Sequence, residues 1–367
     1  MHTPPGYRIS SSRLPLNLLL FDMDGVLIDV SRSYREAIQK TVQIYLEKVL
    51  GLRKVPQNLI TQVDIALFKS IGGFNNDWDL TSGALLYLLS ILGLPPLPNR
   101  KRFKKINEIA LYLRAQAAPF ALRTDRLLRR KKLSSFSRAV RSSGGGLTGI
   151  RRTSMKTRHA SWEGWVYRTG DIDEENLIKR IFQEIYLGRQ FTVCYRCQRL
   201  FYSGPGYYLR ERLLIPRSIL SSLRKNVRLG IASGRPRFDA ELALRKFRVS
   251  SYFDSVVTFD ECQEEEHRLL RETGRRVNRS KPHPYSLLRA AQEIGITHPR
   301  CAYVGDAVDD MKAARAAGKK LAMKAIGFVG SHGDRKRARE SLLSAGADLL
   351  IEDPEDLLSL LPPSPEE

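Results

Sequence analysis

The sequence predicts an α/β protein in which a parallel-sheet core carries an inserted, mostly helical domain. The run Leu16–Phe21 is almost continuously apolar, which is typical of a strand buried on both faces of a parallel sheet. From Leu213 onward, short apolar segments alternate with segments of helical periodicity, as strands and helices do in such a core. Between these two parts the periodicity is mostly helical, which indicates the inserted domain.

Each element is predicted from its apolar pattern and from the residues that end it. A helix is expected over 33–50, because its apolar residues fall on one stripe and Gly51 follows them. Further helices are expected over 59–70, 82–93 and 174–187, and further core strands over 227–232, 255–259, 301–304, 321–327 and 348–351. The resulting domain boundaries are 14–31 and 212–367 for the core, and 32–211 for the inserted domain.

The positive charge of the chain is concentrated in one segment. The 367 residues include 61 lysines and arginines against 39 acids, a net charge of +22. The stretch from Arg100 to His159 holds 18 basic and two acidic residues, and so carries +16 of this charge. Three interpretations stay open for an insertion at about 98–160: a flexible, solvated extension, a surface that binds nucleic acid or another polyanion, and a membrane-surface segment.

The remaining composition excludes several classes of protein. Four cysteines in a chain of this length do not make a disulfide framework. Cys194 and Cys197 form one C-x-x-C, without the second pair that a structural zinc site needs. The apolar run Leu16–Phe21 is too short for a secretory signal or a membrane span. The sequence therefore predicts a cytoplasmic protein without a transmembrane segment.

Two acids follow the first predicted strand. Asp22 and Asp24 lie two residues apart on an extended segment, so both carboxylates project to the same side. The carboxyl ends of strands are where open α/β sheets bind ligands. Two neighbouring carboxylates repel each other unless a cation binds both, or one serves as an acid while the other serves as a base. By itself, this motif is equally consistent with a turn.

Two phosphate-compatible motifs come later in the chain. Ser233 and Gly234 form a turn after the strand at 227–232, and the hydroxyl and N–H groups of such a turn suit a phosphate. Lys281 is followed by Pro282, which restricts the backbone and presents the ammonium at a defined point. A common Ser-Gly turn and a solvated lysine are the plain alternatives.

A second acidic motif follows the strand at 301–304. Asp306 comes directly after it, and a helix beginning near Asp306 would bring Asp310 onto the same face one turn later. Carboxylate oxygens in this arrangement suit Mg²⁺, which keeps further coordination for water and a substrate phosphate. A helix-capping acid beside a solvated pair is the alternative.

The order of these four elements is more specific than any one of them. Along the chain they are Asp-x-Asp-Gly, Ser, Lys and Gly-Asp-x-x-x-Asp, each at or near the end of a strand. In this order they resemble the four signature motifs of the haloacid dehalogenase superfamily. The resemblance implies a Rossmann-like core with a helical cap domain inserted after the first motif, as in the phosphoglycolate-phosphatase-like branch.

The resemblance also implies a role for each matching residue. Asp22 is implied as the nucleophile, and Asp24 as the general acid and base. Ser233 and Lys281 are implied as the phosphate-binding and charge-balancing residues. The implied Mg²⁺ ligands are Asp22, Asp306, Asp310 and the backbone carbonyl of Asp24.

The implied activity is hydrolysis of a phosphate monoester through an aspartyl-phosphate. The family's dehalogenases look different at Asp24 and lack the metal-binding acids, so carbon–halogen cleavage is not expected. The expected substrate is a small phosphorylated metabolite, such as phosphoglycolate or a sugar phosphate, and the expected assembly is a monomer or homodimer. A phosphomutase using the same site, and a polyanion-binding protein acting through 100–160, are the alternatives.

Five residues are candidates for substrate contact. Gly234 and Arg235 belong to the turn after the strand at 227–232, and Arg32 stands near the entry to the expected cap. Asn76 and Trp78 lie in a polar loop between apolar flanks. Packing between the cap and the core explains this loop equally well.

Overall fold

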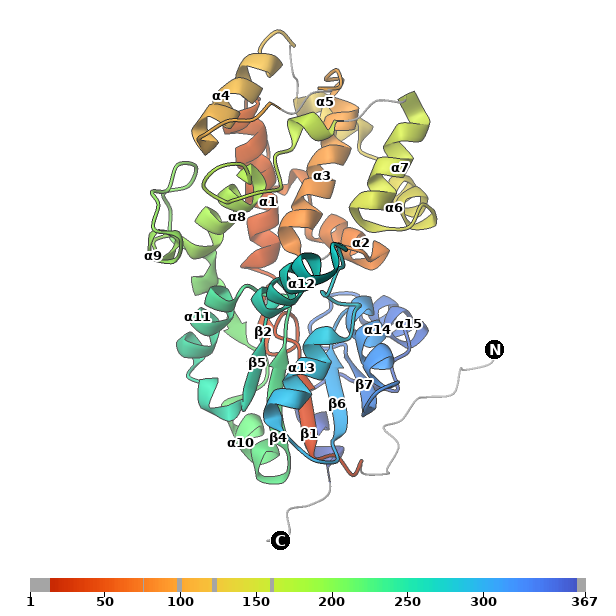
Figure 1. Ribbon diagram of the computed structural model, residues 1–367. Coiled ribbons are helices and arrows are strands. Elements are labelled where there is room, and N and C mark those ends of the chain that lie inside the picture. Colours follow the sequence, from red (N-terminus) through yellow and green to blue (C-terminus); the bar gives the residue numbers. More distant parts are fainter. Residues whose placement is uncertain (1–13, 75, 98–100, 121–123, 159–161, 362–367) are drawn as a thin grey trace, which may run out of the picture. The chain divides into compact units, whose positions relative to one another are not determined.

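The computed structural model of the chain describes residues 14–74, 76–97, 101–120, 124–158 and 162–361. The chain divides into two compact units (Figure 1). Unit 1 comprises the described residues of Met1–Asp29 and Arg212–Glu367, and unit 2 those of Val30–Glu211. The chain therefore leaves unit 1 after Asp29 and returns to it at Arg212.

Unit 1 is built on a six-stranded sheet in the order β5–β4–β1–β6–β7–β8, in which all neighbouring strands are parallel. The strands are β1 (Leu18–Phe21), β4 (Arg228–Ala232), β5 (Ser255–Val257), β6 (Arg300–Gly305), β7 (Ala322–Phe328) and β8 (Leu349–Ile351). All four residues of β1 are buried between β4 and β6, which explains their continuous apolar run. The predicted α/β fold with a parallel sheet is confirmed.

Helices cover this sheet and enclose an apolar core. They are α10 (Arg217–Asn226), α11 (Arg237–Phe247), α12 (Phe259–Thr273), α13 (Tyr285–Ile294), α14 (Val308–Ala317), α15 (Arg335–Ser344) and α16 (Asp356–Ser359). α13 packs against β4 and β5, and α14 against β6 and β7. Leu18, Leu20 and Leu287 are among the fully buried residues of this core, whose burial supplies the main stabilising force.

A short antiparallel ribbon marks the point where the chain leaves and re-enters unit 1. β2 (Ile28–Asp29) pairs with β3 (Arg212–Leu213), so that Asp29 lies opposite Arg212. The N–H of Leu214 extends the pairing by donating to the carbonyl of Leu27 at 2.8 Å. Two points that are distant in the sequence are therefore neighbours in space.

Unit 2 consists largely of helices in its described residues. They are α1 (Tyr34–Ile44), α2 (Gln62–Ile71), α3 (Asp77–Leu92), α4 (Ile106–Ala117), α5 (Thr124–Arg130), α6 (Leu133–Ser142), α7 (Gly146–Arg158), α8 (Leu177–Leu187) and α9 (Gln190–Tyr195). The helix expected over 33–50 is α1 continued by a π-helical turn at Tyr45–Val49. α1 packs against α3 and α8, where the Tyr34 ring stacks on Tyr186 at 4.3 Å.

The described residues of the basic segment are largely helical, which the sequence analysis did not predict. Its described residues form α4 to α7, and each of these helices buries apolar side chains. Ile109, Leu127, Val140 and Ile150 are at most 1% exposed. The burial of these residues stabilises helices in a stretch where 18 of the 60 residues from Arg100 to His159 are lysine or arginine.

A buried ion pair fixes the loop that follows α9. Arg180 is 1% exposed, and its guanidinium donates to Glu184 at 2.7 Å and to Asp173 at 2.8 Å. The Glu184 carboxylate also accepts the backbone N–H groups of residues 200–202 at 2.7–2.9 Å. A single buried carboxylate therefore holds both the arginine and the loop.

Replacing Arg180 with methionine is expected to lower the free energy of unfolding by about 3–5 kcal/mol, because it leaves the buried Glu184 carboxylate without its cation. Urea denaturation of the full chain measures this loss. Arg189→Met removes an exposed arginine just before α9, and its expected effect is within about 0.5 kcal/mol. Equal losses in the two variants would contradict the assignment of Arg180 to a buried ion pair.

The described residues contain no helix with both the length and the apolar character needed to cross a membrane. The four cysteines are free thiols, of which Cys262 and Cys301 are buried. The guanidinium of Arg180 lies 3.1 Å from the Cys197 sulfur. The metal-compatible cluster found in the described part of the chain includes neither Cys194 nor Cys197.

Candidate active site

Three of the predicted site residues of unit 1 directly follow its central strands, whereas Lys281 precedes α13 and Asp310 lies in α14. Asp22 comes directly after β1, Ser233 after β4 and Asp306 after β6. β1 lies between β4 and β6; the chain runs from β1 to β4 and β5 on one side, and then crosses to β6, β7 and β8 on the other. This is the switch point at which open α/β sheets bind their ligands.

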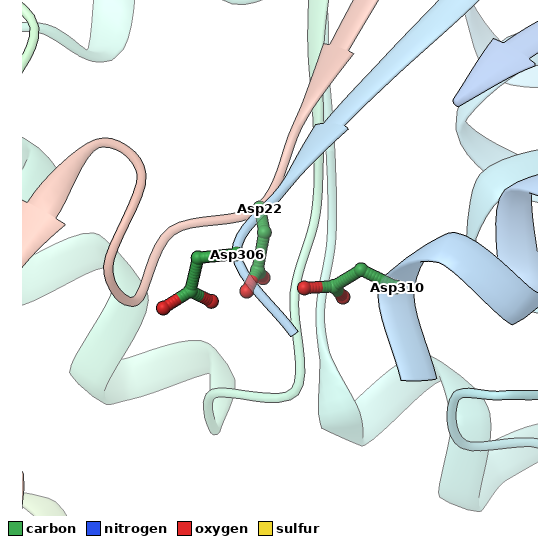
Figure 2. Close-up of side chains that lie close together, drawn as sticks. All are labelled: Asp22, Asp306 and Asp310. Carbon is green, nitrogen blue, oxygen red and sulfur yellow. The ribbon is translucent and has the colours of Figure 1, made fainter. Parts of the chain in front are cut away.

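Three carboxylates converge at this point. Asp22, Asp306 and Asp310 each offer an oxygen within 4.8 Å of the others, and Figure 2 shows the three side chains pointing toward a common centre. Asp22 and Asp310 are buried, while Asp306 is half-buried. The backbone N–H of Asp22 donates to Val304 at 2.9 Å, which ties the end of β1 to β6.

Lys281 joins two of these acids. Its ammonium donates to Asp310 Oδ1 at 2.6 Å and lies 2.9 Å from Asp22 Oδ1, the latter contact being an ion pair without hydrogen-bond geometry. Burial works to lower the pKa of Lys281, but the carboxylates of Asp22 and Asp310 outweigh it and raise this pKa well above its ordinary value. Lys281 is therefore a cation held beside the first acid of the cluster.

The hydroxyl of Tyr303 orients Lys281. Tyr303 is fully buried in β6, accepts from the ammonium at 2.9 Å and donates to the carbonyl of Ala232 at 2.9 Å. Burial and then Asp22 raise the pKa of this phenol well above its ordinary value. Sequence reasoning missed Tyr303, although a lone hydroxyl three residues before Asp306 in an apolar strand is the signal that could have revealed it.

The cluster fits a divalent cation bound through oxygen. Burial is the main cause that raises the pKa of Asp22; Lys281 opposes it, the neighbouring carboxylates add to it, and the result is about 7. A cation between the three carboxylates would relieve this repulsion. Oxygen is also the donor that Mg²⁺ prefers. The residues present therefore have the donor type, spacing and unbalanced charge that such an ion requires.

Asp24 is paired with an arginine and lies outside this cluster. The Nε of Arg235 donates to Asp24 Oδ1 in a close ion pair. Arg235 is fully buried, whereas the side chain of Asp24 is 24% exposed. Substrate contact by Arg235 stays a prediction; in the structure its side chain is buried and paired with Asp24.

Ser233 is part of a tight turn after β4. It is buried, its N–H donates to Val257 at 2.9 Å, and its Oγ accepts the N–H of Arg235 at 3.3 Å. Gly234 is half-buried between these two residues. The hydroxyl thus shapes the turn that also carries Arg235.

Asp306 and Asp310 are brought together differently from the expectation. α14 begins at Val308, two residues after Asp306, so the acids do not share a helix. The N–H of Ala307 donates to Asp310 Oδ2 at 3.0 Å, which starts the helix, and Asp306 belongs to the preceding turn. His332, which the sequence reasoning missed, lies with Nε2 2.9 Å from the backbone carbonyl of Asp306.

Gly25 gives Asp306 its space. Gly25 has φ +80°, and a Cβ at this position would lie 2.0 Å from Asp306 Oδ2. Gly25→Ala is therefore expected to displace Asp306 and to reduce turnover at least about tenfold, which corresponds to roughly 1.4 kcal/mol. Gly295→Ala is the matched control, because Gly295 has φ +74° with nothing within 4 Å of such a Cβ. Steady-state kinetics of both variants would separate the effect of the clash with Asp306 from the effect of backbone strain. Equal losses of turnover in the two variants would refute the clash as the cause.

The candidates in unit 2 have structural partners of their own. Asn76 caps α3 by accepting the N–H of Asp79 at 2.8 Å. Trp78 is 6% exposed, and its ring contacts Phe182 edge-on at 6.2 Å. Arg32 is largely exposed, with Nε 3.9 Å from Glu36. Packing accounts for Asn76 and Trp78, and substrate contact by these three residues stays a prediction.

Comparison with known proteins agrees with this arrangement. Residues 214–318 match the family model of haloacid dehalogenase-like hydrolases. A phosphoglycolate phosphatase of Xylella fastidiosa (strain 9a5c) is 34% identical over 125 residues, which are 34% of this chain and 45% of that protein. An imidazoleglycerol-phosphate dehydratase of Phytophthora nicotianae is 24% identical over 83% of this chain and 42% of its own length. The chain thus spans less than half the length of these relatives.

The overall fold is also shared with a solved structure. A Northeast Structural Genomics Consortium target solved by X-ray superposes with a TM-score of 0.59 and 18% identity, covering 94% of this chain and 98% of that one. This likeness concerns the fold. The family match covers the part of the core that holds Lys281, Asp306 and Asp310, and it does not include Asp22. Together, they show that residues 214–318 are similar to haloacid dehalogenase-like hydrolases and that the chain shares the fold of a solved structure.

Proposed function

We propose that this chain is a Mg²⁺-dependent phosphate monoester hydrolase that acts through an aspartyl-phosphate on Asp22. The observation that carries the proposal is the meeting of Asp22 with Lys281, Asp306 and Asp310 at the carboxyl end of β1. A nucleophilic carboxylate can approach a phosphate only where positive charge offsets both groups. Asp22 has such a partner in Lys281, and the two further acids can supply another by holding a metal.

Mg²⁺, when bound by Asp22, Asp306, Asp310 and the backbone carbonyl of Asp24, would offset the negative charge of the phosphoryl group and of these acids. The remaining contributions come from the chain itself. Lys281 stays protonated and balances charge beside the attacking oxygen. Ser233 and Gly234 form the turn that would receive the phosphate oxygens.

The first half-reaction transfers the phosphoryl group to Asp22. A carboxylate oxygen of Asp22 attacks phosphorus, and the bond from phosphorus to the ester oxygen breaks. The leaving alkoxide takes the proton carried by the carboxyl group of Asp24, and an alcohol departs. Splitting one displacement into two through a covalent intermediate lowers the barrier of each.

The second half-reaction restores Asp22. The carboxylate of Asp24 takes a proton from water, whose oxygen attacks the phosphorus of the aspartyl-phosphate. The bond from phosphorus to the Asp22 oxygen breaks, inorganic phosphate leaves, and both acids return to their starting states. An acceptor hydroxyl in place of water would make the enzyme a phosphomutase, so the same panel of substrates should be examined for phosphate transfer as well as release.

We infer that unit 2 acts as the cap that selects a small phosphorylated metabolite. The support is its insertion directly after the first motif, between Asp29 and Arg212. Arg32 is a candidate for substrate contact, because its guanidinium is largely exposed. The Xylella relative, a phosphoglycolate phosphatase, makes phosphoglycolate the first compound to test.

Phosphate release from a panel of metabolites and an aryl phosphate tests the proposal. The panel contains phosphoglycolate, sugar phosphates and p-nitrophenyl phosphate, each with Mg²⁺ or with EDTA. Turnover with Mg²⁺ alone is the expected result. Equal turnover in EDTA would refute the metal requirement, and no turnover of any compound would refute the phosphatase assignment.

A second candidate function, binding of a polyanion, is favoured by the surface of α6. Its apolar residues Leu133 and Val140 are buried, while Arg138 and Arg141, one turn apart, are exposed. An apolar face that is already buried cannot enter a membrane, whereas the arginine face can follow a phosphate backbone. Phe136 packs on Tyr87 at 4.5 Å and is not free to stack on bases, so a duplex suits this surface better than a single strand.

Salt-dependent retention on duplex DNA tests this candidate. Because the segment contributes to the interior of unit 2, we would neutralise exposed charges instead of deleting it, using Arg130→Gln, Lys132→Gln and Arg138→Gln together. The slope of log affinity against log salt should fall by up to about 2.7 if all three contact phosphates. Arg275→Gln, Arg276→Gln and Lys319→Gln in unit 1 change the net charge equally. An equal decrease of this slope in both triple variants would exclude a polyanion-binding surface on α5–α6.

A further inference from the structure

Arg235 is buried in unit 1 although it carries a permanent charge. It is 1% exposed and is one of the largest fully buried side chains in the described residues. Arginine is almost never buried without a partner. Its guanidinium is paired with Asp24, which stands two residues after Asp22. The residue that follows the phosphate-binding turn is therefore joined to the candidate proton donor.

The backbone around Arg235 is held at both ends. Its N–H donates to Ser233 Oγ at 3.3 Å, and its carbonyl accepts the N–H of Phe259 at 2.8 Å. Pro236 follows and precedes the first turn of α11. Because the peptide groups on both sides of Arg235 are fixed, its side chain starts from a fixed backbone position. The guanidinium can therefore orient Asp24, which it binds.

The pairing constrains Asp24 in one particular way. Arg235 holds Oδ1 of the carboxyl group, so rotation about the last side-chain bond is restricted and the position of Oδ2 is set. Asp24 is also 24% exposed, in contrast to its buried partner. One oxygen is therefore committed to the protein interior, and the other is the oxygen that can exchange a proton with a substrate.

We propose that Arg235 is a positioning residue for proton transfer, which holds Asp24 so that Oδ2 delivers the proton to the leaving oxygen. The inference rests on the proposed phosphatase function. In this step the bond from phosphorus to the ester oxygen breaks, and the electron pair stays on the leaving oxygen. The proton passes from Asp24 Oδ2 to that oxygen, and the resulting carboxylate remains paired with Arg235.

The importance of this positioning depends on the leaving group. An alkoxide is strongly basic and departs slowly unless it is protonated during bond breaking. A nitrophenolate is a weak base and departs without a proton. A misplaced Asp24 therefore slows the release of an alcohol far more than the release of a nitrophenol, whereas general damage to the site slows both.

The experiment compares the two leaving groups in Arg235→Lys, which keeps the charge and loses the planar fork. We would measure kcat/KM, which reports the first half-reaction, for the best alkyl phosphate of the panel and for p-nitrophenyl phosphate. The expected loss is about 100-fold for the alkyl ester, at the low end of what a positioned acid contributes, and several-fold at most for the aryl ester. The ratio of the two constants is independent of the folded fraction, because both assays use the same sample.

Two further variants sharpen the comparison. Arg237→Lys alters a nearby arginine, the first residue of α11, which pairs with Glu261, and it should leave the ratio unchanged. Asp24→Asn should reproduce the selective loss. If Arg235 acts only through Asp24, adding Arg235→Lys to Asp24→Asn should cost little more, since residues that act as one unit are not additive.

The outcomes separate this inference from the function on which it rests. If the wild type hydrolyses neither ester, the phosphatase proposal fails. If the wild type is active and Arg235→Lys slows both esters equally, or neither, the positioning role is refuted while the phosphatase stands. Full additivity with Asp24→Asn would also refute it.

Discussion

Replacing Asp22 with asparagine is expected to lower kcat for phosphate release by about 10⁴-fold or more, because the nucleophile is lost while its shape is kept. Phosphate release from the best panel substrate, with Mg²⁺ present, measures the effect. Asp254→Asn is a matched control: the Asp254 side chain is 10% exposed against 9% for Asp22, and it pairs with Arg224 and Arg228 away from the site. Turnover that survives Asp22→Asn would refute the covalent mechanism.

The same variant should not lose stability. In the fold Asp22 has a pKa of about 7, raised above its ordinary value mainly by burial. Between the ordinary value and 7 the folded chain keeps a proton that the unfolded chain has released, so stability falls as pH rises through this window and the cost is complete above it. Asparagine removes this cost. In metal-free buffer at pH 8, the variant is expected to melt no lower than the wild type.

Mg²⁺ is expected to raise the melting temperature of the wild type and not that of Asp306→Asn. A ligand at 100 times its Kd stabilises the folded state by about 2.7 kcal/mol, which corresponds to a shift of roughly 5 °C or more for a domain of this size. Thermal melts in MgCl₂ and in NaCl of equal ionic strength measure the shift without relying on activity. Asp254→Asn should keep the shift, and a full shift in Asp306→Asn would exclude that residue as a ligand.

The strands of unit 1 are predictable because a parallel strand carries its own signal. Leu18–Phe21 lies within the expected 16–21, and Ala322–Phe328 is displaced by one residue from 321–327. Helix starts are less predictable where a polar cap decides them. α3 begins at Asp77, five residues before the expected 82, because the Asn76 side chain starts the helix inside a polar loop.

The site is predictable only as far as strand ends determine it. Asp22, Ser233 and Asp306 gather because neighbouring parallel strands end at one edge of the sheet. The partner of Asp24 is not predictable in this way. Arg235 is 211 positions from Asp24 in the sequence, and their contact depends on the turn that Ser233 closes. The helices of the basic segment were missed because its 18 lysines and arginines suggest a solvated stretch, although apolar residues such as Ile109, Leu127 and Val140 are buried between them.

The ribbon of β2 and β3 makes unit 2 a replaceable module. Because Asp29 lies opposite Arg212 in an antiparallel pair, a hairpin loop of about two residues would be long enough to join them. The whole of unit 2 thus occupies the place of a β-turn. An insertion at such a turn can be lengthened, shortened or exchanged during evolution while β1, β4 and β6 keep their register. Divergence between this chain and relatives that share its core is therefore expected to concentrate between these two residues, where new substrate preferences can be acquired without rebuilding the chemistry.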